Sequence, residues 1–344
     1  MKAERGTIAI HFVQEAVRCL APRGLDAAEF LARAGIPPAF LNEPLARVSP
    51  QQFGLLWRDV ARALNDEFFG LDRHPARVGS YALMCASALG SADLSQALRR
   101  CLHFMSLVLD DVRGELVVDG ERVTIRLHDP QHDPQHGHGR AADGHSRLFA
   151  HATYLIMVYG LACWLVGRRI ALLEGQFACP EPVAAHEYRV LFCEALRFDA
   201  DMTTLVFARS VLQLPVVQTA ATLREFLREA PANFLVKYRD PKSLAARIRR
   251  RLRERPVGEW PAFEQFCAEL HLSEATLRRR LRDEGHTYQS IKDDLRRDQA
   301  IALLQGSRRS LPDIAAALGF AEPSAFHRAF KKWTGARPSD YRAG

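Results

Sequence analysis

The stretch FEQFCAELHLSEATLRRRLRDEG, residues 263–285, decides the fold of the C-terminal part of the chain. Phe266 and Leu270 share one face of a short helix, because residues four apart lie above one another on a helix. After a tight turn, Leu277 and Leu281 repeat that spacing in a second helix. We therefore predict two short helices that pack their apolar faces together across the turn.

A second copy of this pattern lies at residues 311–335, LPDIAAALGFAEPSAFHRAFKKWTG. The apolar positions correspond at an offset of 48 before the turn and 49 after it. The matching pairs are Phe266 and Ile314, Leu270 and Leu318, Leu272 and Phe320, Leu277 and Phe326, and Leu281 and Phe330. Between the copies, residues 288–305 are helical in pattern and would span about 27 Å at 1.5 Å per residue. We predict two helix-turn-helix units joined by one long helix.

The opposite face of each second helix is polar and basic. Ser273 is a capping candidate in the first unit, and the outward positions follow the spacing i, i+3, i+4, i+7. These positions are Ala275, Arg278, Arg279 and Arg282 in the first unit and Ser324, His327, Arg328 and Lys331 in the second. A small residue beside guanidinium groups suits a helix in a major groove, since Arg can pair with guanine edges or grip phosphate. A linking helix of this length can place two such helices about 34 Å apart, in successive major grooves.

Charge is distributed unevenly along the chain. Residues 241–344 contain 21 Lys and Arg against 13 Asp and Glu, a net of +8, whereas residues 1–240 contain 26 against 27, a net of −1. A basic C-terminal part beside a neutral remainder indicates a polyanion-binding module joined to a different domain. The alternative, an all-helical domain with a solvated basic face, is disfavoured because the exposed faces match in two tandem units.

The C-terminal 100 or so residues resemble the AraC/XylS family of transcription regulators. The resemblance rests on RDQAIALL from residue 297, IAAALGF from 314, SAFHRAFKK from 324 and GARPSDYR from 335. It implies contact with double-stranded promoter DNA and with RNA polymerase. The DNA-contacting residues that we expect are Ser273, Ala275, Thr276, Arg278, Arg279, Arg282, Pro323, Ser324, His327, Arg328 and Lys331. Pro323 departs from the family pattern, in which a polar residue is commoner, so the second unit is expected to contact fewer bases.

The N-terminal part has a different periodicity. Residues 8–110 are helical in pattern, and two alternating segments then flank Asp119-Gly120, a signal for a type I′ hairpin. An apolar helix (148–167), a strand (169–173), a helix (183–192) and two short strands (196–198 and 204–207) follow. The order β-β-α-β-α-β-β after a helical start predicts an α+β domain.

The fold class that we predict is therefore an α+β N-terminal regulatory domain followed by an all-α C-terminal domain with two helix-turn-helix units joined by a long helix. The expected boundaries are 1–215 for an effector-sensing and oligomerisation domain, 216–240 for a linker and 241–344 for the DNA-binding domain. Residues 79–98 and segments between 179 and 215 resemble the regulatory domain of the ornithine-utilisation-regulator branch of the same family. That resemblance implies an arabinose-binding-like sensor without identifying its effector.

Residues 148–167 contain no Asp, Glu, Lys or Arg and are long enough to cross a membrane. They include His151, Thr153 and Tyr154, whose polar groups would be costly in lipid, so we expect a buried helix of a cytoplasmic protein with no membrane partner. The helix either packs as core or lines an effector pocket. The seven cysteines include no CxxC pair and indicate reduced, mostly buried thiols; redox sensing by one of them is the disfavoured alternative.

Residues 128–138, HDPQHDPQHGH, are rich in histidine. Neutral imidazoles bind zinc, nickel or copper, and His132, His136 and His138 are the candidate ligands. The Pro and Gly content favours a solvated loop instead, and we expect no cofactor.

These observations favour an effector-responsive regulator. We expect its N-terminal domain to form a homodimer, and the family resemblance implies that it activates transcription. The alternative is a constitutive DNA-binding repressor or architectural protein whose N-terminal domain only oligomerises. An enzyme is disfavoured because residues 1–240 contain no nucleophile–base constellation, phosphate-binding loop or cofactor fingerprint.

Overall fold

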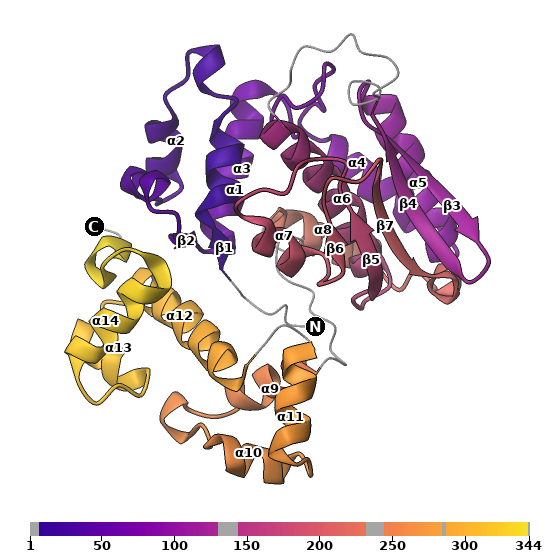
Figure 1. Cartoon of the computed structure of the whole chain (residues 1–344). Helices are drawn as coiled ribbons and strands as arrows, with labels where there is room; N and C mark the ends of the chain where they lie inside the picture. Colours follow the sequence, from indigo (N-terminus) through magenta and orange to yellow (C-terminus); the bar gives the residue numbers. More distant parts are fainter. Residues whose placement is uncertain (1–6, 130–143, 232–243, 284–286, 343–344) are drawn as a thin grey trace. The chain divides into compact units, whose positions relative to one another are not determined.

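The structure, a computed structural model, describes residues 7–129, 144–231, 244–283 and 287–342. These residues form two compact units, which are interleaved along the sequence. The first comprises residues 11–34 and 50–231 of the described chain, and the second comprises residues 7–10, 35–49 and 244–342. Figure 1 shows the elements of both units.

The first unit contains a five-stranded sheet with the order β3-β4-β7-β5-β6. Its strands are β3 (Arg113–Asp119), β4 (Arg122–His128), β5 (Leu172–Gln176), β6 (Leu196–Arg197) and β7 (Thr203–Ala208). All neighbours are antiparallel except β5 and β6. The predicted α+β order of elements is confirmed, with strand ends displaced by a few residues.

The predicted hairpin is confirmed as the pair β3 and β4, but its turn is displaced by one residue. The loop is Gly120-Glu121, because Asp119 pairs with Arg122. Positive φ falls on Gly120 (52°), whereas a type I′ turn requires positive φ at both loop residues. The type I′ prediction was therefore wrong.

Helices precede and cover the sheet. They are α1 (Ile10–Val17), α2 (Ala27–Arg33), α3 (Pro50–Leu64), α4 (Ser80–Leu89), α5 (Leu94–Val108), α6 (Gly144–Leu165), α7 (Ala185–Leu191) and α8 (Ala220–Glu229). α5 packs against β3 and α6 packs against α5 (Figure 1). Gly114 of β3 permits this approach, because a Cβ there would lie 2.5 Å from the hydroxyl oxygen of Tyr154 and 2.6 Å from Leu102.

α6 is the apolar helix that the sequence marks between residues 148 and 167. It is long and apolar enough to cross a membrane by composition, but 94% of its apolar window is buried inside the protein. Both ring nitrogens of its buried histidine have partners: His151 Nδ1 lies 2.8 Å from Thr203 Oγ1, and His151 Nε2 lies 2.9 Å from Asp129. Arg147 forms an ion pair with the same Asp129. The prediction of a buried helix is confirmed.

α8 begins at the Thr219 capping box and lies within residues 216–240, the expected linker. It belongs to the first unit, because the Phe226 ring stacks on Trp164 with 4.4 Å between centroids. Residues 232–243, which include the end of the predicted linker, lie outside the described residues.

The second unit contains α9 (Leu244–Arg253), α10 (Phe263–Glu269), α11 (Glu274–Asp283), α12 (Tyr288–Gly306), α13 (Leu311–Ala317) and α14 (Pro323–Thr334). Among the described residues after 243 the chain has no strand, and α12 matches the long helix predicted over 288–305. The same unit includes a small antiparallel pair, β1 (Ile8–Ala9) and β2 (Arg47–Val48), in a region whose pattern was helical.

Residues 7–10 and 35–49 pack on the last elements of the chain. The Phe40 and Tyr341 rings lie 4.5 Å apart. The backbone N–H of Arg47 donates a hydrogen bond of 3.0 Å to the Tyr341 hydroxyl. The Thr7 hydroxyl donates to Asp298 of α12 over 2.9 Å. These two N-terminal segments are therefore structural parts of the unit that contains the helix-turn-helix pairs.

Candidate nucleic-acid interface

The first helix-turn-helix unit, α10 and α11, is held by a buried apolar cluster. Phe266, Leu277 and Leu281 are at most 1% exposed and pack with Ile248 of α9 and Ile291 of α12. Full burial of such side chains contributes about 1.5–3 kcal/mol each. The predicted inward positions are confirmed, and they determine which face of α11 remains outside.

The turn between α10 and α11 places His271 in a left-handed conformation, with φ 54°. Gly319 has the equivalent place in the second unit and a similar φ of 74°. Ser273 caps α11, since its Oγ accepts a hydrogen bond from the backbone N–H of Thr276 over 3.2 Å. The Thr276 hydroxyl lies 2.8 Å from the same Oγ and is therefore partly engaged in the cap.

The outer face of α11 carries the basic positions. Ala275, Arg278, Arg279 and Arg282 are all exposed, as their spacing predicted. Arg278 forms an ion pair with Glu274 (3.0 Å), and its guanidinium lies 5.0 Å from the centre of the Phe263 ring. The ion pair holds the long side chain along α11 and the ring contact places it beside the first residue of α10, while it stays 62% exposed.

The second helix-turn-helix unit, α13 and α14, repeats this arrangement. Its inward residues Ile314, Leu318, Phe326 and Phe330 are all 0% exposed. Its outer face exposes the predicted positions, which are Pro323, Ser324, His327, Arg328 and Lys331. Pro323 is the first residue of α14, where its missing N–H costs no helical hydrogen bond.

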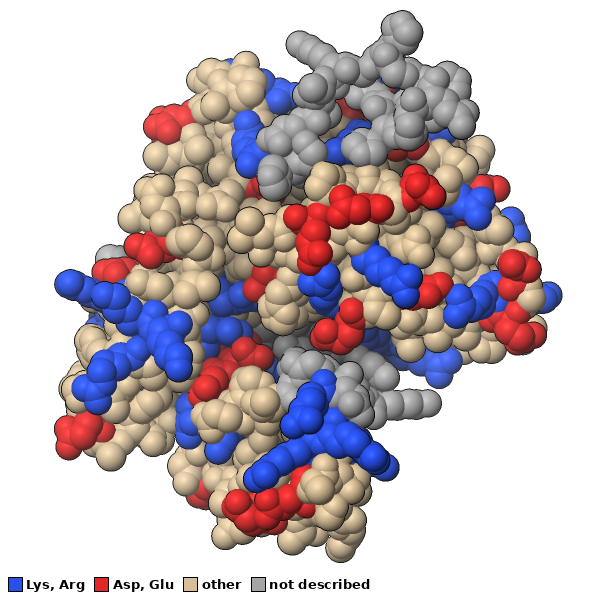
Figure 2. Space-filling view, in the orientation of Figure 1, with Lys and Arg blue, Asp and Glu red and all other residues tan. Residues whose placement is uncertain are grey.

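Positive side chains gather over both second helices. In Figure 2, Lys and Arg cluster over α11 and, separately, over α13 and α14. The exposed cations of the two outer faces are Arg278, Arg279 and Arg282 on α11 and Arg328 and Lys331 on α14, so each face suits a negatively charged partner. Phosphate groups of nucleic acid are such a partner.

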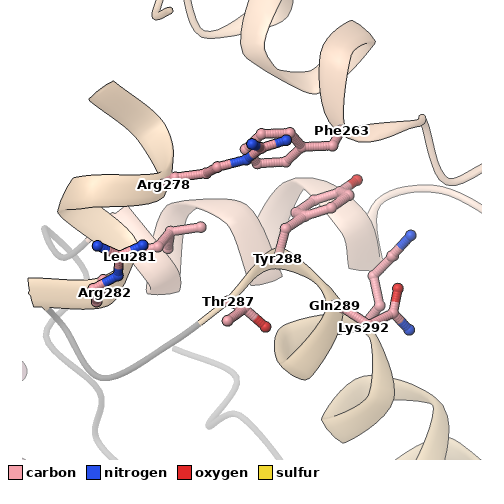
Figure 3. Close-up of a pocket in the computed structure, with 8 residues that line it drawn as sticks. All are labelled: Phe263, Arg278, Leu281, Arg282, Thr287, Tyr288, Gln289 and Lys292. Atoms are coloured by element: carbon pink, nitrogen blue, oxygen red, sulfur yellow. The ribbon is translucent and has the colours of Figure 1, made fainter. Parts of the chain in front are cut away.

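A pocket of about 360 Å³ lies between α11 and the start of α12 (Figure 3). Phe263 and Tyr288 supply aromatic walls, and Arg278, Arg282 and Lys292 supply positive charge. The Lys292 ammonium lies 4.8 Å from the Tyr288 ring, and burial lowers the pKa of Lys292. Sequence reasoning did not find this pocket, because its walls come from three separate helices.

Sequence reasoning also missed three residues at the junction of the two helix-turn-helix units. The guanidinium of Arg296, in α12, lies 5.3 Å from the Trp260 ring and 5.8 Å from the Phe320 ring. Phe320 was identified only as an apolar turn residue. No spacing in the sequence connects it with Trp260 or Arg296, which come from different elements.

The other candidate sites lie in the N-terminal part of the sequence, before residue 216. His132, His136 and His138 fall outside the described residues, so the metal site stays a prediction. The described histidine nearest to them in sequence, His128, lies 3.0 Å from a carboxylate oxygen of Glu115. Most apolar side chains of α6 are buried, and an effector pocket along that helix also stays a prediction.

The described cysteines are free thiols, and five of the seven are buried. Burial raises the pKa of Cys163 to about 11 and that of Cys101 to about 12. Such thiols are protonated near neutral pH, which disfavours the reactive thiolate that redox sensing requires.

Comparison with known proteins identifies both parts of the chain. Residues 24–216 match the family described as the arabinose-binding domain of AraC transcription regulators, and residues 266–344 match a helix-turn-helix domain. The Ornithine utilization regulator of Pseudomonas aeruginosa is 28% identical over 97% of this chain and 96% of its own length. The transcriptional regulator VqsM from the same organism is 26% identical over 76% of this chain and 77% of its own. The crystal structure of CdpR, also from Pseudomonas aeruginosa, aligns with 97% of this chain and 98% of its own at 21% identity and a TM-score of 0.30.

Proposed function

This chain belongs to the AraC family of transcription regulators, and from that premise we propose that it activates transcription in response to a small-molecule effector. DNA binding resides in the second compact unit, which contains α9 to α14. Effector sensing and dimerisation reside in the first compact unit, whose residues make up most of the arabinose-binding-like match.

The observation that carries the proposal is the pair of exposed basic helix faces on α11 and α14. Each face is opposite a fully buried apolar face, so the two helices are fixed on their units with their cationic side chains outward. Both helix-turn-helix units pack on α12. The first does so through Ile291 and Leu295 at the start of α12, and the second through contacts of α13 and α14 further along. One continuous helix therefore links the two DNA-facing elements.

The side chains divide by chemistry. Arg278, Arg279 and Arg328 are the proposed readers of guanine edges, since a guanidinium can contact such an edge with two hydrogen bonds. Ala275 and Ser324 permit close approach of the helix to the groove floor. Ser273, Thr276, Arg282, Pro323, His327 and Lys331 complete the proposed contact set.

The remaining parts of the proposal follow from the family. The relatives are DNA-binding regulators, so we place this chain in the cytoplasm, with RNA polymerase as its partner on promoters and with no catalytic activity of its own. The name of the Ornithine utilization regulator makes ornithine the first compound to screen as an effector.

The test combines ligand binding with transcription. Full-length chain is melted with individual compounds, beginning with ornithine, and then added with purified RNA polymerase to templates carrying its selected binding site. A ligand at 100 times its Kd stabilises the protein by about 2.7 kcal/mol, and the same compound should raise transcript yield. A compound that raises the Tm but lowers transcription would make the protein a repressor. Unchanged Tm and transcription across the panel would favour the constitutive alternative.

A further inference from the structure

The two helix-turn-helix units contact one another directly, beside the middle of α12. The turn of the second unit at Gly319 approaches the connector before α10: a Cβ on Gly319 would lie 3.5 Å from Val257 and 3.7 Å from Gly258. Val257 is 5% exposed. The junction is therefore a packed contact, in addition to the shared helix.

Arg296 lies at this junction with an aromatic ring from each unit beside its guanidinium. Trp260 follows the connector of the first unit and packs against that unit's buried cluster, and its indole N–H donates to the Leu252 carbonyl over 2.7 Å. Phe320 follows Gly319 in the second unit and lies 5.7 Å from the Phe326 ring of α14. Each ring is thus attached to the core that positions one of the two outer helices.

The environment of Arg296 suits stacking better than solvation. Its Nε is buried and has no hydrogen-bond partner among the described residues. Burial is also the largest effect on its pKa, which is lowered from the usual value. A guanidinium can stack on aromatic faces while remaining charged, which an ammonium does less well.

We propose that Arg296 fixes the spacing at which α11 and α14 meet DNA, by joining Trp260 of the first unit to Phe320 of the second. This inference rests on the proposed function, since it concerns two units on one site. Arg296 is a positioning residue: it lies on the middle of α12 and acts through the two rings. Its removal frees the second unit to shift relative to the first.

Spacing is the property that this junction would control. One base pair inserted between the two halves of a site moves them apart by about 3.4 Å and rotates them by about 35°. A rigid junction cannot follow that change, so the inserted site should bind much more weakly. A loosened junction can follow it in part, and the penalty for insertion should then fall.

The experiment measures the affinity of the full-length chain for duplexes carrying its two half-motifs at the selected spacing and with one base pair inserted or deleted. The measured ratio is the affinity for the selected spacing divided by the affinity for the altered spacing. For Arg296→Met we expect this ratio to fall by about 5-fold or more, the effect of losing two partly buried cation–π contacts. Phe320→Leu should lower the ratio in the same direction. Arg250→Met is the matched control, because it removes one positive charge at an exposed position of α9 and should leave the ratio unchanged.

The outcomes separate this inference from the proposed function. If wild type yields no two-part site, the proposed function fails before spacing can be compared. If wild type discriminates between spacings and Arg296→Met and Phe320→Leu discriminate equally well, the positioning role of Arg296 is refuted. An equal fall in Arg250→Met would assign the effect to charge and would also refute it.

Discussion

Replacing Arg278 with alanine tests how the first unit recognises DNA. The side chain is 62% exposed and its contacts are with Glu274 (3.0 Å) and the Phe263 ring (5.0 Å). An exposed pair four residues apart on a helix contributes about 0.3–0.5 kcal/mol, and an exposed cation–π contact about 0.5–1 kcal/mol. The free energy of unfolding should therefore fall by no more than about 1.5 kcal/mol.

The effect on DNA binding should be larger and confined to particular bases. A two-bond contact between arginine and guanine contributes about 1–3 kcal/mol to base discrimination, which is about 5- to 150-fold in affinity. We expect Arg278→Ala to lose that factor on the selected site and to bind as wild type does once the contacted base is changed. The assay is fluorescence anisotropy at fixed salt over every single-base variant of the site.

Arg280→Ala is the control for this measurement. Arg280 is exposed on the same helix but lies about 150° around it from the centre of the proposed face. The control removes the same charge and should weaken binding only slightly and evenly. A uniform loss of affinity across all base variants in Arg278→Ala would make Arg278 a phosphate contact and refute its proposed role as a base reader.

The remaining predictions concern stability and are checked by chemical denaturation of the full chain. Gly319→Ala should cost about 1–2 kcal/mol, because alanine at φ 74° is strained, whereas His271→Gly at the equivalent turn should be neutral or stabilising; an equal loss from both would refute the backbone argument. Burial alone would raise the pKa of Asp129, but its hydrogen bonds and ion pairs lower it overall. Its stabilisation is therefore present above about pH 4 and is lost as pH falls through the lower folded pKa. Asp129→Asn should lower the free energy of unfolding at pH 7 and reduce its dependence on pH below about pH 4. An unchanged pH dependence in that range would contradict this. Tyr341→Phe should cost about 0.5–1.5 kcal/mol, since it removes the acceptor of the Arg47 N–H; a variant as stable as wild type would show that this bond does not stabilise the unit.

The repeated pattern of apolar residues made the C-terminal unit predictable. Phe266 and Leu277 in the first pair of helices and Phe326 in the second are buried where the spacing placed them, so the opposite faces had to be exposed. The sheet was predictable for a similar reason, because the residues of β4 alternate between buried and less buried positions. Local periodicity was sufficient in both cases.

Contacts between distant segments were not predictable. Phe40 packs on Tyr341 although most of the sequence separates them. Nothing local in residues 35–49 indicates a partner after residue 335. The same holds for Arg296 between Trp260 and Phe320. The turn at Gly120 was misassigned because one glycine satisfies several turn types, and pairing of the flanking strands determines the loop.

The most direct test of the account is selection of binding sites from random duplex DNA with wild type and with a variant carrying His327→Ala and Arg328→Ala. Wild type should enrich a two-part motif whose halves are centred about one helical turn apart, 10–10.5 base pairs. The variant should retain one half and lose preference in the other, because both replaced residues are exposed on α14. Enrichment of the same two-part motif by both proteins, or of none by wild type at moderate salt, would contradict the claim that α11 and α14 each recognise half of one site.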